Sequence, residues 1–348
     1  MSKVAVIGAG SWGTALAIVL ADNGCEVAMY ARRQELVDEI NQQHTNTRYL
    51  PDITLPENIV AYSSYSQVLK GAEYVLIVLP TAAIRPALRE MIKELNHRPL
   101  IIHSSKGLEP DTHKRVSEMI AEEVPESKRR GLVVLSGPSH AEEVSRRSPT
   151  TVVVAGSDLK QAEEVQDLFI NQHFRVYTNT DMLGVEIGGA LKNIIALGAG
   201  LSDGLGYGDN AKAALMTRGL TEIARLGVQM GAHPLTFAGL AGVGDLIVTC
   251  TSRHSRNWRC GYAIGQGKPL DEVLASMGMV VEGVRTTKAA YQISQAWQVE
   301  MPITAELHHV LFKGKPPRQA VDDLMGRGRT HEMESRFFED LNRYISET

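Results

Sequence analysis

The feature that most constrains this fold is a glycine-rich run near the N-terminus, Gly8-Ala9-Gly10-Ser11-Trp12-Gly13. A β-rich apolar run precedes it over residues 3–7, and an apolar run of helical character follows over residues 14–20. A strand, a G-x-G-x-x-G turn and a helix in this order indicate a dinucleotide-binding unit. The alternative is an ordinary strand-to-helix turn that happens to be rich in glycine.

The three glycines have separate roles in a dinucleotide-binding turn. Gly8 permits the tight turn, Gly10 lets the backbone approach a pyrophosphate, and Gly13 lets the helix pack closely on the strand. The helix N-terminus adds unbonded N–H groups and a partial positive charge, both of which attract phosphates. We therefore predict that this segment binds NAD or NADP.

Short runs rich in Val, Ile and Leu recur through the first half of the chain, between segments of helical character. They cover residues 4–7, 27–30, 74–79, 100–103, 132–135 and 151–155. Such continuous apolar runs are typical of strands buried on both faces of a parallel sheet. The alternation of strands and helices predicts an α/β, Rossmann-like doubly wound sheet over residues 1–180.

The second half has a helical pattern. Apolar residues recur at helical spacing in Met216, Leu220, Ile223, Leu226 and Met230, and similar patterns follow in 270–275, 284–297 and 303–312. We predict an all-helical domain over residues 181–348, in which the segment after about residue 342 frays. An ordinary composition, 43% hydrophobic and 22% charged, suits two globular domains.

The end of the second predicted strand bears on the choice between NAD and NADP. An acidic residue there binds the ribose 2′-hydroxyl of NAD, whereas arginine accepts the 2′-phosphate of NADP. The chain has Arg32 and Arg33 at this point and no acidic residue. We predict that NADP(H) is accepted and preferred, the alternative being two solvated arginines at a helix start.

Lys192 is the candidate acid–base group. A ketone that receives a hydride becomes an alkoxide, so the enzyme must also deliver a proton. Lys192 lies in Gly188-Gly189-Ala190-Leu191-Lys192-Asn193-Ile194-Ile195, a small and apolar helical segment. Burial there would lower the pKa of the lysine toward the working range. The alternative is a lysine that extends to the surface.

A polar segment farther along the chain is suited to a phosphate monoester. Ser255 is a good N-cap for a helix over 258–264, and Arg256 and Asn257 then lie in its first turn. An ordinary capped helix start is the alternative. Asp245, after Gly244, either orients Lys192 or a substrate hydroxyl, or is a simple turn aspartate.

Polar residues also follow two predicted strands of the first domain. Lys106 comes after the strand at 100–103, and Ser139 comes after the strand at 132–135. Because open α/β sheets bind ligands at the carboxyl ends of their strands, both are candidates for substrate contact. His103 and His140 are secondary acid–base candidates, with a structural role as the alternative. The eleven histidines show no metal-ligand spacing, and we expect no metal.

Charge and cysteine content exclude some classes of protein. The net charge is −4 and the pI is about 6.3, so no bulk positive field is present to hold nucleic acid or an anionic membrane. The three cysteines are widely spread and show neither metal spacing nor a disulfide framework. Apolar runs are too short or too interrupted for a signal peptide or a membrane span. We expect a cytoplasmic protein.

The motifs taken together resemble the bacterial-type NAD(P)-dependent glycerol-3-phosphate dehydrogenase family. The resemblance rests on the runs GAGSWGTAL from Gly8, SKG from Ser105, SGPS from Ser136, GALKNIIALGAG from Gly189, and GVGDLIVTC from Gly242 with SRN from Ser255. It implies interconversion of dihydroxyacetone phosphate and sn-glycerol 3-phosphate, in supply of glycerophospholipid synthesis. It also suggests a homodimer.

The resemblance assigns roles to individual residues. It implies that Lys192 donates the proton in reduction, with Asp245 beside it. The implied substrate contacts are Lys106, Gly137, Ser139, Lys192, Asp245, Ser255, Arg256 and Asn257. The implied cofactor contacts, besides Gly8, Gly10 and Gly13, are Ser11, Trp12, Arg32, Arg33, Lys106, Ala141, Arg256, Val280 and Glu282.

Two other functions stay open from the residues. One is a dehydrogenase of the same architecture that acts on a β-hydroxyacid or a sugar nucleotide. The other is a cofactor-sensing binding protein without turnover, which would not need Lys192 together with Asp245.

Overall fold

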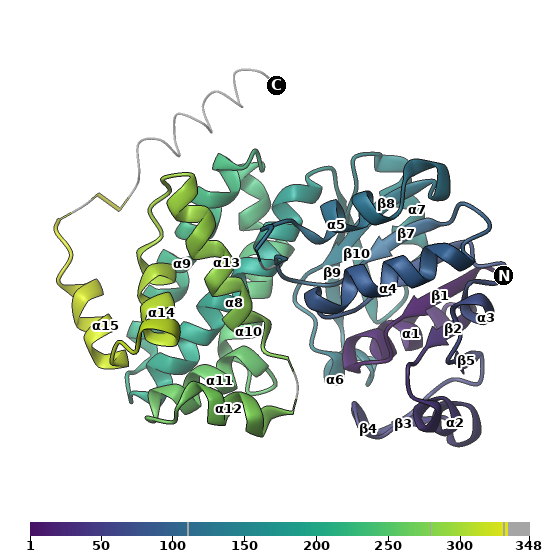
Figure 1. Cartoon of the computed structure of the whole chain (residues 1–348), viewed down its shortest axis with the longest axis horizontal. Coiled ribbons are helices and arrows are strands. Elements are labelled where there is room, and N and C mark those ends of the chain that lie inside the picture. Colours follow the sequence, from purple (N-terminus) through teal and green to yellow (C-terminus); the bar gives the residue numbers. More distant parts are fainter. Residues whose placement is uncertain (110, 279, 330, 333–348) are drawn as a thin grey trace. The chain divides into compact units, whose positions relative to one another are not determined.

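The computed structural model describes residues 1–109, 111–278, 280–329 and 331–332. The chain divides into two compact units, Met1–Glu186 and Ile187–Thr348, and the division falls inside helix α8 (Met182–Gly204). The tail expected to fray after residue 342 lies outside the described residues. Figure 1 labels the elements of both units.

The first unit is built on an eight-stranded sheet. Its strands, in the spatial order β10-β9-β8-β7-β6-β1-β2-β5, are β10 (Phe174–Asn179), β9 (Thr150–Ala155), β8 (Gly131–Ser136), β7 (Leu100–His103), β6 (Tyr74–Ile77), β1 (Lys3–Ile7), β2 (Glu26–Tyr30) and β5 (Ile59–Tyr62). All neighbours pair in parallel except β8 and β9. A small hairpin of β3 (Thr45–Asn46) and β4 (Leu50–Thr54) stands apart. This is the doubly wound sheet that the sequence predicts.

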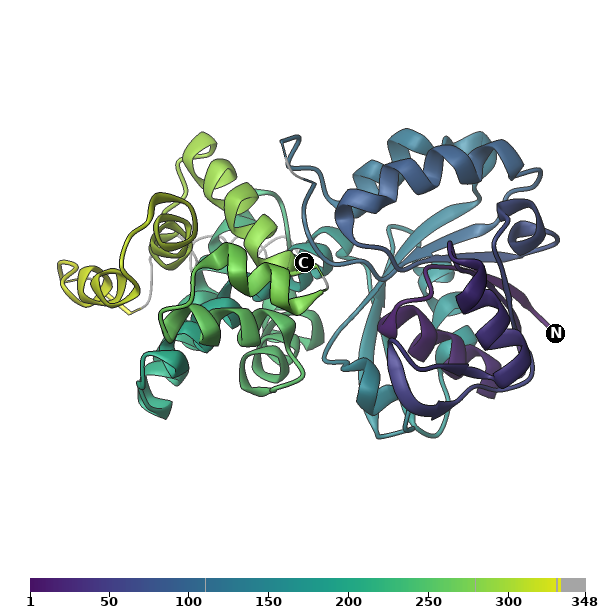
Figure 2. The ribbon, with the colours of Figure 1, turned by 60° about the horizontal axis from the view of Figure 1, so that its bottom comes forward.

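Helices cover both faces of this sheet, as Figure 2 shows. Because side chains alternate along a strand, Val4 and Val6 of β1 belong to one core, whereas Ala5 and Ile7 belong to the other. The first core also contains α1 (Ser11–Asp22), α2 (Gln34–Gln43), α6 (Ala141–Val144) and α7 (Leu159–Phe169). The second contains α3 (Tyr65–Leu69), α4 (Thr81–Glu94) and α5 (Val116–Glu123). A short 3₁₀ turn follows at Glu126–Lys128.

The structure departs from the sequence prediction at the edges of the sheet. Strands β5 and β10 have no counterpart among the predicted runs, and the strand expected to reach Leu79 ends at Ile77. In β10 buried and exposed residues alternate at first, so it lacks the continuous apolar run of an inner strand. β9 pairs antiparallel because the chain leaving β8 passes through only the one-turn helix α6 and returns in the opposite direction.

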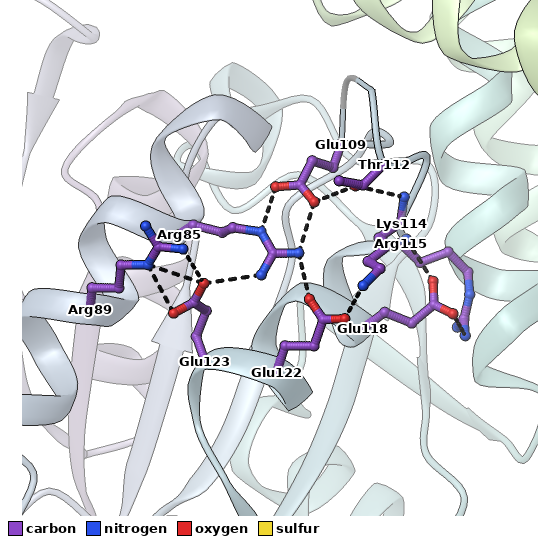
Figure 3. A network of polar contacts seen from close by, with 9 residues as sticks. All are labelled: Arg85, Arg89, Glu109, Thr112, Lys114, Arg115, Glu118, Glu122 and Glu123. Carbon is purple, nitrogen blue, oxygen red and sulfur yellow. Dashed lines mark hydrogen bonds and ion pairs between the residues drawn. The ribbon is translucent and has the colours of Figure 1, made fainter.

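Charged side chains join α4, α5 and the loop that follows β7 (Figure 3). Arg85 of α4 binds Glu109 of the loop through two N–H groups, at 2.5 and 2.8 Å, and also binds Glu122 at 2.7 Å and Glu123 at 3.0 Å. Arg89, one turn farther along α4, binds Glu123 alone among these carboxylates. Arg85 is therefore the centre of the network.

This network makes stability depend on pH. Hydrogen bonds from Arg85 lower the pKa of Glu109, and bonds from Lys114 and Arg85 lower that of Glu122. The bond from Arg89, together with Arg85, lowers the pKa of Glu123. A carboxyl whose pKa is lower in the folded chain stabilises the fold above its unfolded pKa. That contribution is lost as the pH falls through the folded pKa.

We expect Arg85→Ala to lower the melting temperature at pH 7 by about 2–4 °C. The effect is modest because solvent partly screens the ion pairs that Arg85 makes with the three carboxylates. The deficit should shrink as the pH falls below the ordinary carboxyl pKa of 4.5, because the wild type then loses the same interactions. Thermal unfolding of both proteins between pH 7 and pH 3.5 measures this difference. Arg89→Ala is the control, since its side chain is 63% exposed against 17% for Arg85. A deficit that is independent of pH would contradict the expectation.

The second unit consists of helices in the residues that the structure describes. After α8 come α9 (Asp209–Gln229), a 3₁₀ turn (Pro234–Ala238), a π-helical turn (Leu240–Gly244), α10 (Asp245–Thr251), α11 (Arg256–Gly265), α12 (Leu270–Met277), α13 (Glu282–Ala296), α14 (Pro302–Lys313) and α15 (Pro317–Met325). Four helices match the apolar periodicity seen in the sequence. The run at 216–230 is α9 with its C-cap, and the runs at 270–275 and 303–312 lie within α12 and α14. The run at 284–297 ends one residue after α13.

Glycines allow α8 and α11 to cross with their backbones in contact. A Cβ atom at Gly200 of α8 would lie 1.9 Å from the carbonyl oxygen of Trp258, and one at Gly261 of α11 would lie 1.9 Å from that of Leu197. Because real Cβ atoms do not approach carbonyls so closely, the crossing requires glycine at both positions. It fixes the N-terminus of α11 against the middle of α8.

Helix α8 is apolar enough to pass a test for membrane spans. Among the described residues it is the one helix that does so, yet 89% of its most apolar window is buried inside the fold. Most of the apolar surface of α8 is therefore covered by the fold itself.

All three thiols are buried and unpaired. Burial raises the pKa of Cys25, raises that of Cys250 to about 12 and raises that of Cys260 to about 11. Since the thiolate is the reactive form, these cysteines are held in their inert form at neutral pH.

Candidate active site

The glycine-rich turn leaves room for a phosphate group beside the start of α1. Gly8 has φ +128°, a conformation that favours glycine, and a Cβ atom at Gly13 would lie 1.9 Å from the carbonyl oxygen of Gly8. A Cβ atom at Gly10, by contrast, would meet nothing within 4 Å. Gly10 is the N-cap of α1 and makes no side-chain cap, and the first turn carries no acidic residue. These features fit the pyrophosphate of a dinucleotide.

The order of the strands places this turn at the switch point of the sheet. From β1 the chain proceeds outward through β2 to one edge, whereas β6, β7 and β8 extend to the other side. In open α/β sheets the ligand crevice lies at such a reversal, outside the carboxyl ends of the strands. Trp12 of α1 donates to the Ser104 hydroxyl at 2.8 Å, which ties the turn to the end of β7.

Two of the predicted substrate residues meet beyond the ends of β7 and β8. The Lys106 ammonium donates to the carbonyl oxygen of Gly137 at 3.1 Å, and the Ser139 hydroxyl donates to the same oxygen at 3.0 Å. Gly137 has φ +137°, which favours glycine in this turn. Ala141, the first residue of α6, follows this turn and is buried. Lys106, Gly137 and Ser139 therefore form one cluster.

Arg32 and Arg33 lie on the other side of β1 from this cluster. They follow β2, where Arg33 is the N-cap of α2, and both are exposed. Ser11 donates to the carbonyl oxygen of Tyr49 at 2.8 Å, so its hydroxyl contacts the segment before β4. The predicted 2′-phosphate contacts and the predicted substrate contacts therefore follow strands on opposite sides of β1.

Lys192 is buried and paired in the second unit. Its side chain is 8% exposed and that of Asp245 is 1% exposed. The ammonium donates to Asp245 Oδ1 and to the Thr249 hydroxyl, the latter at 2.7 Å. The hydroxyl of Thr249 donates in turn to the carbonyl oxygen of Asp245 at 2.6 Å. The ammonium therefore has a carboxylate and a hydroxyl as acceptors within the buried site.

Helix packing explains why these groups meet. Gly188 lies one turn before Lys192 on the same face of α8, and a Cβ atom there would lie 2.6 Å from the carbonyl oxygen of Ala241. The π-helical turn that contains Ala241 leads directly into Asp245, the first residue of α10. Close packing at Gly188 therefore brings the next turn of α8 to the start of α10.

Sequence reasoning missed Thr249 as a member of the site. A signal was present, since Asp245 and Thr249 are four residues apart and share a face of any helix that contains both. Asp245 was left open between an orienting residue and a turn residue. The structure places it in the first turn of a helix, fully buried.

The start of α11 has the predicted cap and a further buried contact. The Ser255 hydroxyl accepts from the N–H of Trp258 at 3.2 Å, as an N-cap does. The Asn257 amide donates to Asn193 Oδ1 at 2.8 Å, and its oxygen accepts from the N–H of Gly283 at 2.9 Å. Asn257 thus links α8, α11 and the start of α13, a role that its position in the first turn did not indicate.

Arg256 brings another predicted segment to this helix start. It is exposed, and its guanidinium donates to the carbonyl oxygen of Val280 at 3.1 Å. Glu282, two residues on, begins α13. Glycine at 283 is required, since a Cβ atom there would lie 2.6 Å from the carbonyl oxygen of Asn193. The contacts with Arg256 and Asn193 therefore position residues 280–283, a segment that carries no chemical signature in the sequence.

The two histidines that the sequence offered as acid–base candidates lie in the first unit. His103, a secondary acid–base candidate, is fully buried with Nε2 3.3 Å from Glu186 Oε1. His140 is the N-cap residue of α6. In the part of the chain that the structure describes, no group of three or more His, Cys, Asp or Glu residues is placed to hold a metal ion.

Comparison with known proteins identifies the family of the chain. Residues 3–162 match the model of the N-terminus of NAD-dependent glycerol-3-phosphate dehydrogenase, and residues 181–322 match that of its C-terminus. The chain is 64% identical over 343 residues to a glycerol-3-phosphate dehydrogenase [NAD(P)+] of Bacillus cytotoxicus, covering 99% of this chain and 100% of the relative. It is 62% identical to that of Bacillus velezensis over 334 residues, covering 96% of this chain and 97% of the relative.

A solved structure agrees with this assignment. The crystal structure of glycerol-3-phosphate dehydrogenase from Coxiella burnetii superposes with a TM-score of 0.89 at 39% identity, covering 94% of this chain and 99% of that chain. The two family models match most of the chain, each over the elements that carry one of the clusters described above. The chain belongs to the NAD-dependent glycerol-3-phosphate dehydrogenase family.

Proposed function

We propose that this chain reduces dihydroxyacetone phosphate to sn-glycerol 3-phosphate with NAD(P)H, and catalyses the reverse reaction. The observation that carries the proposal is the buried Lys192 ammonium, held by Asp245 and Thr249 in a family whose named members are glycerol-3-phosphate dehydrogenases. A ketone reductase needs a proton donor of this kind, and a binding protein does not.

The reduced nicotinamide, when bound, supplies a hydride for the carbonyl carbon of the substrate. Lys192 holds the proton that the carbonyl oxygen takes up as the alkoxide forms. Asp245 and Thr249 accept hydrogen bonds from the ammonium and so fix its position.

The phosphate of the substrate requires a cationic and hydrogen-bonding site. We assign it to the start of α11, where Ser255, Arg256 and Asn257 lie, because a helix N-terminus and a guanidinium both favour a phosphate dianion. Lys106, Gly137 and Ser139 form the substrate contacts of the first unit.

The cofactor is assigned to the first unit. The turn over Gly8, Gly10, Ser11, Trp12 and Gly13 is assigned to the pyrophosphate. Lys106, which follows β7, and Ala141, the first residue of α6, are assigned as further cofactor contacts. Arg32 and Arg33 face the adenine ribose. Arg256, Val280 and Glu282 complete the set from the second unit.

Arg32 and Arg33 should set the preference for NADPH. We expect the double substitution Arg32→Ala and Arg33→Ala to lower kcat/KM for NADPH by about 10- to 100-fold, because two charge-assisted contacts to the 2′-phosphate are lost. kcat/KM for NADH should change by less than about threefold, since NADH lacks that phosphate. Steady-state kinetics with both cofactors measure this. A wild type with a strong preference for NADH that survives the substitution would contradict the assignment.

A spectrophotometric assay tests the function itself. Purified protein should oxidise NADPH or NADH when dihydroxyacetone phosphate is added. It should not oxidise either cofactor when a β-keto acid is added. Oxidation with that substrate would indicate a β-hydroxyacid dehydrogenase. Cofactor binding without turnover on any of these substrates would indicate a sensor.

We further assign the enzyme to the cytoplasm, as a homodimer that supplies glycerol 3-phosphate for glycerophospholipid synthesis.

A further inference from the structure

A buried carboxylate without a part in the proposed chemistry lies in the first turns of α8. Glu186 Oε1 accepts from the backbone N–H of Ser117 at 2.8 Å and lies 3.3 Å from His103 Nε2. Its Oε2 accepts from the Ser117 hydroxyl at 2.6 Å and from Arg115 at 2.6 Å. All of these residues belong to the first unit. Glu186 thus joins α8 to the end of β7 and to the start of α5.

The carboxylate is held in its charged form. Burial alone would raise the pKa of Glu186, but its contact with His103, the charge of Arg115 and the bond from Ser117 outweigh burial and lower the pKa. The carboxylate accepts three hydrogen bonds, one at Oε1 and two at Oε2, and the Arg115 guanidinium pairs with its charge.

Such a cluster is better explained by geometry than by stability. A buried ion pair typically contributes no more to stability than well-packed apolar residues of similar volume. What it adds is directionality, because three hydrogen bonds fix the carboxylate in position and rotation. The cluster therefore defines how the first turns of α8 are seated, in a way that apolar packing would leave looser.

Lys192 lies six residues farther along the same helix. At a rise of about 1.5 Å per residue it is about 9 Å from Glu186 along the helix axis, with no break between them. A small rotation or shift at the anchor is therefore carried to the ammonium group. His103, on the other side of the anchor, directly precedes Ser104, which accepts from Trp12.

We propose that Glu186 is a positioning residue for the reaction: it seats α8 so that Lys192 is presented in the orientation needed for proton delivery. This inference rests on the proposed role of Lys192. It assigns no contact with substrate or cofactor to Glu186.

Glu186→Gln tests the proposal with little change in shape. Ser117 N–H and Arg115 can only donate, and they face different oxygens of the carboxylate. Whichever way the glutamine amide is turned, its NH₂ group faces one of them. We expect kcat for dihydroxyacetone phosphate reduction to fall by about 10- to 100-fold, because misplacement by about 1 Å costs up to about 100-fold. The dissociation constant for NADPH should stay within about twofold of the wild-type value, as the glycine-rich turn is untouched.

Two further measurements separate positioning from general stability. The solvent deuterium isotope effect on kcat should rise, since proton delivery becomes more rate-limiting when Lys192 is misplaced. Glu222→Gln is the control for burial: Glu222 is also buried and accepts from Ile303 N–H at 2.6 Å and Thr304 N–H at 3.2 Å at the start of α14, although burial raises its pKa to about 7. Glu222→Gln should lower the melting temperature without moving kcat or the isotope effect.

The outcomes are distinct. A folded Glu186→Gln protein with wild-type kcat and isotope effect overturns the positioning role and leaves the proposed function standing. If Glu186→Gln does not fold, Ser117→Ala decides, because it keeps the carboxylate and removes only the hydroxyl's bonds to Glu186 and from Arg115, and it should lower kcat by about 3- to 10-fold. An unchanged kcat in Ser117→Ala overturns the proposal. A wild type that does not reduce dihydroxyacetone phosphate overturns the proposed function first, and the positioning role with it.

Discussion

Replacing Lys192 by methionine should lower kcat by about three orders of magnitude, while the dissociation constant for NADPH stays nearly unchanged. A positioned general acid contributes about 10²–10⁴ to rate, and methionine keeps the length and apolar stem of lysine without its proton. Cofactor binding survives because the glycine-rich turn belongs to the first unit. Steady-state kinetics with dihydroxyacetone phosphate and fluorescence titration with NADPH measure the two quantities.

The partner of Lys192 must be treated in the same experiment. Methionine alone leaves Asp245 as a buried charge without its ammonium, a change that costs about 3–5 kcal/mol. The double variant Lys192→Met with Asp245→Asn removes both charges and should restore stability but not turnover. Lys212→Met is the control, because Lys212 also pairs with an aspartate, Asp203, at 2.8 Å in the same unit. Near-normal turnover in either Lys192 variant would refute its role as the proton donor.

The second large effect is expected from Gly261→Ala. The added methyl group would lie 1.9 Å from the carbonyl oxygen of Leu197, so the backbones of α8 and α11 must separate. Overpacking against side chains costs about 1–3 kcal/mol, and here the obstacle is backbone, so we expect about 3–5 kcal/mol. Chemical denaturation followed by circular dichroism measures it.

A neutral glycine provides the comparison for this variant. A Cβ atom at Gly328 would meet nothing within 4 Å, and Gly328→Ala should leave the unfolding curve within experimental error. If Gly261→Ala were as stable as Gly328→Ala, the close crossing of α8 and α11 would be wrong. Activity should fall with stability, because the crossing fixes the residues at the start of α11.

Local patterns in the sequence predicted much of the fold. The glycine-rich turn, the inner strands and the Ser255 cap each depend on residues within a few positions of one another, so their signals survive without tertiary information. The burial of Lys192 was also predictable, since its neighbours on α8 are small and apolar. The order of these segments along the chain carried the family resemblance, and the two family models match the chain over the same segments.

Contacts between distant segments could not be predicted in this way. Asn257 meets Asn193 across 64 positions, and Glu186 meets Ser117 across 69. Edge strand β10 was missed because its alternating burial lacks a continuous apolar run. In each case the partner is set by packing of whole elements, and no local spacing encodes it.

The burial of all three native thiols makes the chain well suited to site-specific dye labelling. Because Cys25, Cys250 and Cys260 are held as unreactive thiols, a cysteine engineered onto an exposed position would be modified by maleimide far faster than any of them. One such handle on each unit would carry a fluorescence donor and acceptor without removing native residues. Energy transfer between them could then be followed while NADPH and dihydroxyacetone phosphate are added.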